Sequence, residues 1–420
     1  MKNFVVEKQE DRQKTENWPQ WLLSARQAAE DVMLSSDWPA SRDEEWKYTD
    51  TSFLERRTFS VPVADEPASV KPDGIASLAS DTAVFVNGSF CPRLSCLPSG
   101  MEFLPSASGF DSLPAALRAK VLVPLANDHP ALFALNLACF RNPAFLRLNR
   151  GASAECHILH YYTGKAETVF FPRICVLAEE RSSLVLSETF FAGDGGFFVA
   201  NVADVFLQEG SALEYLRAFV HHPSAAQISS ARIYQSRDSR ADLFFYTNGG
   251  ALVRDNLSVL LTEPGAQAAV NGLHALAGTA HADSHTCVEH IAPDAASTQL
   301  YKSILRDESH SVFNGKVIVR REAQKTSAYQ LNRNLLLSSE ARVDTKPQLE
   351  IMADDVRCTH GATIGQLDQD QLFYLLSRAI VREEALNMLI SGFVDDVTGK
   401  LKNPRLRSIL LNLISRQALS

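Results

Sequence analysis

Short runs in which apolar and polar residues alternate dominate the chain from about residue 82 to residue 365. Clear examples lie at residues 83–86, 183–186, 202–207 and 316–319. Alternation with a period of two is typical of a β-strand that buries one of its two faces. Apart from a helical interruption near residues 114–137, no helices separate these runs. The pattern therefore does not favour a fold of alternating strands and helices.

A turn motif recurs within this region: an acidic or polar turn, then a small residue, then an alternating strand. Its first four copies are 25 to 29 residues apart, counted from Glu180, Glu209, Asp238 and Glu263. Two more copies, near residues 306 and 338, follow at less regular distances. Repeats of this length, with one strand–turn unit per copy, predict a stacked β-solenoid. The irregular spacing of the later copies leaves a two-sheet β-sandwich as the competing architecture.

Helical patterns replace the strands at both ends of the chain. All four tryptophans lie in the first 50 residues, where residues 21–33 have helical spacing, and we interpret this part as a small cap anchored by aromatic packing. Residues 61–80 contain Pro, Ser, Asp and Gly and predict a linker. We therefore expect an N-terminal helical region with a linker (1–80), a β-solenoid core (81–365) and a C-terminal helical region (366–420).

Three helices are predicted in the C-terminal region. Asp368 is placed to cap the first of them. In the second, four apolar residues share one face at positions i, i+3, i+4 and i+7: Leu386, Leu389, Ile390 and Phe393. These helices either cap the solenoid or bind another protein, and the pattern leaves both interpretations open.

Composition narrows the class of protein. With 420 residues, 45% of them hydrophobic, and a formal charge of −8, the chain has the apolar content for large cores but not the basic surface of a nucleic-acid binder. It has no apolar run of about 20 residues and no signal peptide, so no membrane association is expected. The seven cysteines form no Cys-x-x-Cys pair, which fits a reducing, cytoplasmic setting better than a disulfide framework.

The most informative chemistry lies in residues 354–365, where Cys358 and His360 stand two positions apart. Residues i and i+2 of a strand point to the same face. The pair would therefore present one sulfur and one nitrogen to a single surface, a combination suited to iron or zinc. Because two ligands do not complete a tetrahedral site, the remaining ligands would have to come from elsewhere.

A second group of potential ligands lies within seventeen residues: His274, His281, His285, Cys287 and His290. His285 and Cys287 would share a strand face, and His290 could follow in the next turn. A metal site and a stacked polar ladder of a solenoid are both compatible with this spacing, so its role stays open.

Several segments together resemble the SufB/SufD family, the scaffold components of the Suf machinery for iron–sulfur cluster assembly. The matching segments are residues 45–49, 293–302, 313–319, 323–326, 330–337 and 354–378. The chain resembles the D-type members, because it is short, begins with an aromatic segment and reads Cys-Thr-His-Gly-Ala-Thr from Cys358. B-type members typically carry Glu-His-Glu-Ala-Thr there. Ala379 departs from the family pattern, which usually has glycine at this position.

The resemblance implies a right-handed parallel β-helix that works as a non-catalytic scaffold subunit. It implies a heterodimer with SufB, a SufC ATPase docked on the C-terminal helices, for which the face of Leu386 to Phe393 is the candidate, and a nascent iron–sulfur cluster at the interface with SufB. The family's interface residues fall on Cys358 and His360. The cluster would be transient and shared with SufB, and a cysteine desulfurase system would supply sulfur indirectly. Reduced FAD is a further candidate cofactor of the complex, whereas ATP would be bound only by SufC.

Two other functions are compatible with a chain of this kind. A pure interaction scaffold would shape the complex without touching iron. A β-helix lyase or hydrolase acting on polysaccharides would need paired carboxylates in a groove. The adjacent Asp354 and Asp355 cannot both face one groove in a regular strand. The chain also lacks the phosphate-binding Gly-x-x-x-x-Gly-Lys-[Ser/Thr] loop, so ATP hydrolysis would have to take place in a partner.

Overall fold

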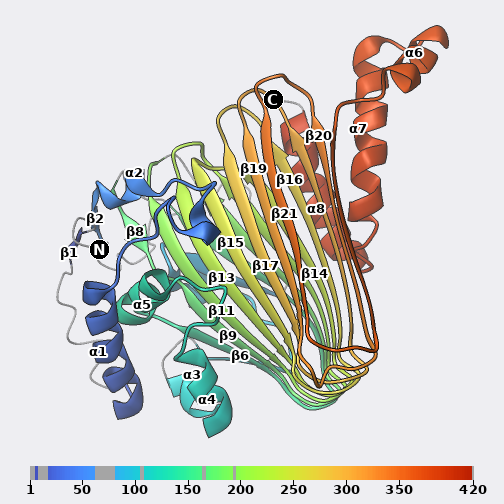
Figure 1. Cartoon of the computed structure of the whole chain (residues 1–420). Helices are drawn as coiled ribbons and strands as arrows, with labels where there is room; N and C mark the ends of the chain where they lie inside the picture. The colour runs from blue at the N-terminus through green and yellow to red at the C-terminus, as the bar shows by residue number, and fades with distance from the viewer. Residues whose placement is uncertain are drawn as a thin grey trace.

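The computed structural model describes residues 5–7, 18–61, 81–104, 108–162, 167–192 and 195–418. Over these residues the chain winds into a long parallel β-solenoid with helices at both ends (Figure 1). The expected fold class, a mainly β parallel β-helix with N-terminal and C-terminal helical regions, is confirmed. The predicted linker lies almost entirely outside the described residues, and the predicted division into three domains stays a prediction.

The N-terminal elements are β1 (Val5–Glu7), α1 (Gln20–Ser35), η2 (Glu44–Trp46), α2 (Ser52–Glu55) and β2 (Thr58–Ser60). Next come β3 (Thr82–Val86), β4 (Ser89–Phe90), η4 (Pro92–Leu94), β5 (Met101–Leu104), α3 (Ser108–Asp111), α4 (Ala115–Val121), α5 (Pro130–Cys139) and β6 (Ala144–Leu148). The predicted interruption near residues 114–137 thus corresponds to α4 and α5.

The solenoid continues with β7 (Ser153–Tyr162), β8 (Val169–Phe170), β9 (Arg173–Ala178), β10 (Ser183–Ala192), β11 (Phe198–Leu207), β12 (Ala212–His221), β13 (Ala226–Gln235) and β14 (Arg240–Gly249). Its later strands are β15 (Leu252–Leu261), β16 (Gln267–Leu276), β17 (His281–His290), β18 (Ala296–Leu305), β19 (His310–Val319), β20 (Thr326–Leu336), β21 (Arg342–Ile351) and β22 (Val356–Gly365). The C-terminal helices are α6 (Gln369–Ser377), α7 (Arg382–Thr398) and α8 (Pro404–Ala418).

Successive strands of the solenoid alternate between two sheets. The even-numbered strands from β10 to β22 continue a sheet that starts with β4, β3 and β7, and the odd-numbered strands from β9 to β21 continue one that starts with β5 and β6. Residues paired across neighbouring even-numbered strands are 27 to 31 positions apart, from Arg240–Gln267 to Ala296–Ser327. One repeat is therefore a full coil of two strands, and the prediction of one strand per repeat was wrong.

The corners of the coils explain the irregular spacing of the turn motif. The first four copies precede β10, β12, β14 and β16 at one corner, whereas the copies near residues 306 and 338 precede β19 and β21 at the opposite corner. At the first corner one residue of each turn has a left-handed conformation, with φ between 53° and 76°: Arg181, Gly210, Asp238, Gly265, Asp294 and Lys325. The backbone N–H of such a residue donates to a carbonyl of the next coil, for example from Arg181 to Glu209 at 2.9 Å. The turns therefore stack in register.

Polar and charged groups are embedded in the otherwise apolar interior of the solenoid. The fully buried guanidinium of Arg217 donates to Glu188 at 2.8 Å, to Asp255 at 3.0 Å and to Asn201 at 2.7 Å. His160 contacts the other oxygen of Glu188 at 2.9 Å. Two carboxylates thus share one cation, and the cluster keeps its charges only while Arg217 stays in place.

The N-terminal helices cover one part of the odd-numbered sheet. Trp38 packs edge-on against Phe198 with ring centroids 6.5 Å apart, and Trp18 stacks on Phe140 at 5.2 Å. Trp46 is also buried in this apolar cluster. These contacts confirm the interpretation of an aromatic cap.

The helices α7 and α8 pack on the outer face of the even-numbered sheet, and α6 projects beyond it (Figure 1). The Asp368 carboxylate accepts from the backbone N–H of Asp370 at 2.9 Å and of Gln371 at 3.3 Å, which confirms the predicted cap. Ala379 follows α6 with φ 60°, a conformation that favours glycine after a helix. No helix among the described residues is long and apolar enough to cross a membrane.

We predict that Arg217→Leu destabilises the fold by about 3–5 kcal/mol, because Glu188 and Asp255 would be left buried without their cation. Thermal unfolding followed by circular dichroism measures the loss. Arg240→Leu is the matched control: Arg240 pairs with Asp242 at 3.0 Å, but its side chain is 50% exposed, so the expected cost is below about 1 kcal/mol. Equal losses in both variants would contradict the prediction.

Candidate functional site at the last coil

The last coil of the solenoid is open on one side. β21 pairs only with β19 and β22 only with β20, and no strand in the described part of the chain pairs with their outer edges. Both strands lie at the end of the stack in Figure 1. Their outward backbone N–H and C=O groups are a template on which a strand of another chain can pair.

Cys358 and His360 lie on the inward face of this last coil. In the parallel register Cys358 is aligned with Ala328 and His360 with Gln330, and those two residues are buried at 1% and 3% exposure. The predicted common face of the pair is therefore confirmed. Cys358 is half-buried beside Val317 and the other residues of a small apolar cluster, whereas His360 is exposed.

The local environment keeps the Cys358 thiol protonated. Burial raises the pKa of this thiol, and a backbone hydrogen bond with Ala328 only partly opposes that effect. Burial of a thiol against apolar neighbours makes it a poor nucleophile and a poor ligand until a positive charge approaches. A nearby metal ion or cationic group would favour the thiolate at this position.

The donor set at this edge is incomplete. Among the residues that the structure describes, no group of three or more His, Cys, Asp or Glu side chains is arranged to hold a metal ion. The inward face of this unpaired coil thus offers one sulfur and one nitrogen, which are too few ligands for a tetrahedral metal site.

A ladder of amide side chains lies behind the pair, and the sequence analysis missed it. Gln299, Gln330, Asn332 and Asn334 are 0–3% exposed on the inner faces of β18 and β20. The Gln330 Nε2 donates to Gln299 Oε1 at 3.4 Å, but Gln330 Oε1 has no hydrogen-bond partner within the described residues. Gln330 is the register neighbour of His360. Its free oxygen is therefore one strand away from the residue that carries the imidazole.

The other predicted group of ligands is divided between two faces. His281, His285 and Cys287 lie on the outer face of the odd-numbered sheet, with the shared face of His285 and Cys287 confirmed. His274 and His290 point into the solenoid. There His274 bonds Ser311 at 2.8 Å and Ser284 at 2.9 Å, and His290 bonds Ser297 at 2.8 Å. The five side chains therefore do not converge on one ion.

The segment around Glu45, matched in the sequence analysis, is a strap across the last coils of the odd-numbered sheet. Arg254 of β15 stacks on the Trp46 ring, 3.6 Å from its centroid, and donates to the Glu45 carbonyl at 2.8 Å. The Glu45 carboxylate lies 3.5 Å from His285 of β17. From β19, Asn314 donates to this carboxylate at 2.7 Å, and the Lys316 ammonium lies 3.7 Å from it.

The strap also reaches the last coil itself, because Glu44 pairs with Lys346 of β21. A hydrogen bond from His285 is the largest of several effects that lower the pKa of Glu45 to about 2. The strap therefore contacts the outer face of β15, β17, β19 and β21. The last of these strands, β21, belongs to the same coil as β22, which carries Cys358 and His360.

The four residues predicted to bind a partner lie on the inner side of α7. Ile390 and Phe393 pack beside the apolar cluster formed with the even-numbered sheet, and Leu386 lines a cleft that faces the solenoid. Leu389 is likewise half-buried. The exposed apolar side chains of this region are others, which the helical periodicity did not single out: Phe373, Tyr374, Val381 and Met388, at 72%, 57%, 66% and 49% exposure.

Val381 and Met388 belong to a shallow depression of about 590 Å³ on the far side of α7. Its other walls include the acidic side chains of Glu383, Glu384 and Asp395. The depression therefore combines apolar contacts with negative charge.

The chain is similar to known proteins over most of its length. Residues 160–393 match the family model described as SUF system FeS cluster assembly, SufBD core domain. An iron–sulfur cluster assembly SufBD family protein of Synechocystis is 31% identical over 414 residues, covering 94% of this chain and 90% of that protein. The iron–sulfur cluster assembly protein SufD of Escherichia coli is 30% identical over 393 residues, covering 92% of this chain and 90% of that protein. The chloroplastic protein ABCI7 of Arabidopsis thaliana is 31% identical over 399 residues, covering 92% and 84%.

We predict that stability falls as the pH is lowered from about 6.5 to about 4. Burial is the main cause that lowers the pKa to about 4 in six histidines: His129, His157, His221, His274, His281 and His290. Between these values the unfolded chain binds protons that the folded chain does not, so acid favours unfolding by up to about 1.4 kcal/mol per pH unit for each histidine. Melting temperatures measured across this range test the effect.

His290→Gln should make the pH dependence shallower. The control is His222→Gln, which changes an exposed histidine and should leave the dependence unchanged. A wild-type melting temperature that stays constant down to pH 4 would show that the buried histidines take up protons without unfolding.

Proposed function

This chain belongs to the SufBD family of iron–sulfur cluster assembly proteins, and on that basis we propose that it is a non-catalytic scaffold subunit of a Suf complex. It pairs with SufB along the edge of β21 and β22, and a nascent iron–sulfur cluster forms between the two chains. The observation that carries the proposal is the combination at the last coil of an unpaired edge with the incomplete donor pair of Cys358 and His360.

The chemistry of the pair suits a cargo that must later leave. Iron approaching the edge would displace the proton of the Cys358 thiol, whose pKa is raised by burial, so the bond to sulfur forms only when metal is present. His360 supplies an exposed nitrogen, and Gln330 would orient its ring. With the remaining ligands on SufB, separation of the two chains would release the cluster.

The SufC ATPase is proposed to dock on the exposed side of α6 and α7. Phe373, Tyr374, Val381 and Met388 supply the apolar contacts, and the acidic rim of the depression suits a basic partner surface. The four residues predicted from the sequence support this surface from behind: Leu386, Leu389, Ile390 and Phe393.

ATP-driven movement of the docked ATPases would reach the site through a short connection. β22 ends at Gly365 and α6 begins at Gln369, so a pull on α6 is transmitted directly to the strand that carries His360. We propose that this pull opens the interface with SufB. A pure interaction scaffold, which never binds iron, is the alternative, and the substitutions below separate the two.

We predict that Cys358→Ser and His360→Ala leave the complex with SufB and SufC intact but lower its iron and acid-labile sulfide content by about tenfold or more. Each removes one ligand at an edge where no other described side chain replaces it. The measurement is iron and sulfide per complex after anaerobic purification of co-expressed subunits. Cys96→Ser, which changes an exposed cysteine far from the last coil in sequence, is the matched control. A cluster content equal to the wild type's in both Cys358→Ser and His360→Ala would favour the pure scaffold.

We predict that Met388→Glu, alone or with Val381→Glu, weakens SufC binding about thirtyfold or more, the loss of one contact of about 2 kcal/mol or more. The variant should still co-purify with SufB, because the substituted positions are on α7 and not on the solenoid edge. Affinity measured by biolayer interferometry with purified SufC tests this. Leu34→Glu, on the 74% exposed Leu34 of α1, should bind SufC normally. Loss of SufC in both variants would reject the proposed surface.

A further inference from the structure

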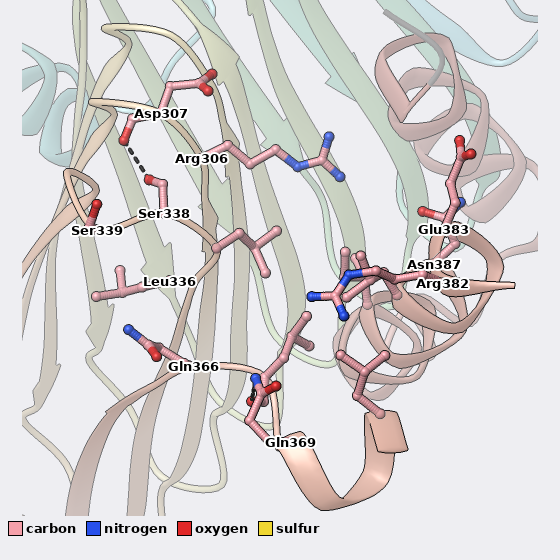
Figure 2. Close-up of a pocket in the computed structure, with 15 residues that line it drawn as sticks. Arg306, Asp307, Leu336, Ser338, Ser339, Gln366, Gln369, Arg382, Glu383 and Asn387 are labelled. Atoms are coloured by element: carbon pink, nitrogen blue, oxygen red, sulfur yellow. Dashed lines mark hydrogen bonds between the residues drawn. The ribbon is translucent and has the colours of Figure 1, made fainter. Parts of the chain in front are cut away.

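A cleft of about 610 Å³ separates the helices α6 and α7 from the ends of the solenoid coils (Figure 2). Its walls are the turns that follow β18 and β20 on one side and the first half of α7 on the other. This volume is within the range of about 300–1,000 Å³ typical of small-molecule sites. The cleft includes neither Cys358 nor His360, and it shares only Glu383 and Asn387 with the depression on the far side of α7.

Two guanidinium groups extend into the cleft from opposite walls. Arg306 comes from the turn after β18 and Arg382 from the first turn of α7, and Figure 2 shows both side chains directed into the space between the walls. Neither side chain has an ion pair with another described residue. Of the acidic residues at the cleft, Asp307 accepts the backbone N–H of Gly278 at 2.8 Å, and Glu383 points away from the interior (Figure 2).

Both guanidinium groups are therefore free of ion pairs within the described residues, although the carboxylates of Asp307 and Glu383 also belong to the lining. Two like charges that face each other across a cleft attract an anion able to bridge them. Guanidinium groups suit phosphate and carboxylate groups best, because their planar N–H donors match the two oxygens.

The rest of the lining combines an apolar surface with three amides and two hydroxyls. The apolar side chains are Leu336, Leu337, Leu367, Leu372, Leu386 and Ile390. Gln366, Gln369 and Asn387 supply the amides, and Ser338 and Ser339 the hydroxyls. An apolar wall beside polar groups gives a small molecule both contact area and an orientation.

We propose that this cleft binds a small amphiphilic oxyanion, with a phosphate or carboxylate group held between Arg306 and Arg382 and an apolar part on the leucine-rich wall. One arginine belongs to the solenoid and the other to α7, so the ligand ties the helix to the solenoid. The proposal concerns this chain alone and does not rest on the proposed role in cluster assembly.

The test is isothermal titration calorimetry of the full-length chain with two phosphate monoesters at constant ionic strength. 1-Naphthyl phosphate and methyl phosphate carry the same charged group but differ in their apolar part. We expect one molecule of 1-naphthyl phosphate per chain, bound at least about tenfold more tightly than methyl phosphate. Arg306→Gln and Arg382→Gln should each weaken its binding by at least about tenfold.

Arg321→Gln is the matched control, because it removes an exposed arginine from a turn outside the cleft and should leave the affinity unchanged. Thermal unfolding curves equal to the wild type's would show that the arginine variants are folded, as expected for exposed positions. Unchanged affinity in both cleft variants, or equal weakening in the control, would overturn the proposal. Binding of an acidic peptide such as pentaglutamate, without binding of 1-naphthyl phosphate, would also overturn it and identify a protein-docking site.

Discussion

A parallel solenoid cannot satisfy the backbone of its last coil from within, and the features of this molecule follow from how its two ends meet that constraint. At the start of the stack, β4 pairs antiparallel with β3 and β5 pairs antiparallel with β6, so both sheets are closed by short reversed strands. At the other end β21 and β22 run parallel to their neighbours and are left open. Short, reversed edge strands resist the addition of further strands, whereas long parallel ones invite it. Among the described strands, the solenoid therefore has open edges at one end and short, reversed edge strands at the other.

Buried polar atoms without a partner occur along the whole described solenoid. In the early coils they include His160 Nδ1, beside the cluster around Arg217, and His221 Nδ1. The last coils add amides such as Gln299 and Gln330, each with a polar atom that finds no partner in the described chain. A buried polar atom without a partner costs about 1–3 kcal/mol. At the open end, a second molecule or water can reach such atoms and complete their bonding.

Period-two alternation was enough to predict the strands and the common face of Cys358 and His360, because those features depend only on local geometry. The solenoid was predicted from the recurring turn motif and from the family resemblance. The number of strands per repeat was not recoverable in the same way. Both corners of a coil use a small residue after an acidic turn, as Ser239 and Ser309 illustrate, so the motif alone cannot tell them apart. That His285 and His290 point to opposite faces could be predicted from the sequence, since they lie an odd number of positions apart along one strand. The strap and the amide ladder depend on contacts between distant segments, such as Glu45 with Asn314, which a single sequence does not reveal.

The C-terminal helices are anchored unevenly, and this determines where a force applied to them would act. The second half of α7 is fixed to the even-numbered sheet by Lys302, which donates to the Phe393 carbonyl and pairs with Asp396, both at 2.8 Å. The start of α8 is fixed by Glu214, which accepts the backbone N–H groups of Lys402 and Asn403. By contrast, α6 and the first half of α7 extend beyond the sheet (Figure 1). A load on the extended part cannot move the anchored half without breaking buried contacts. It passes instead through residues 366–368 into β22, a strand held by hydrogen bonds along one edge only.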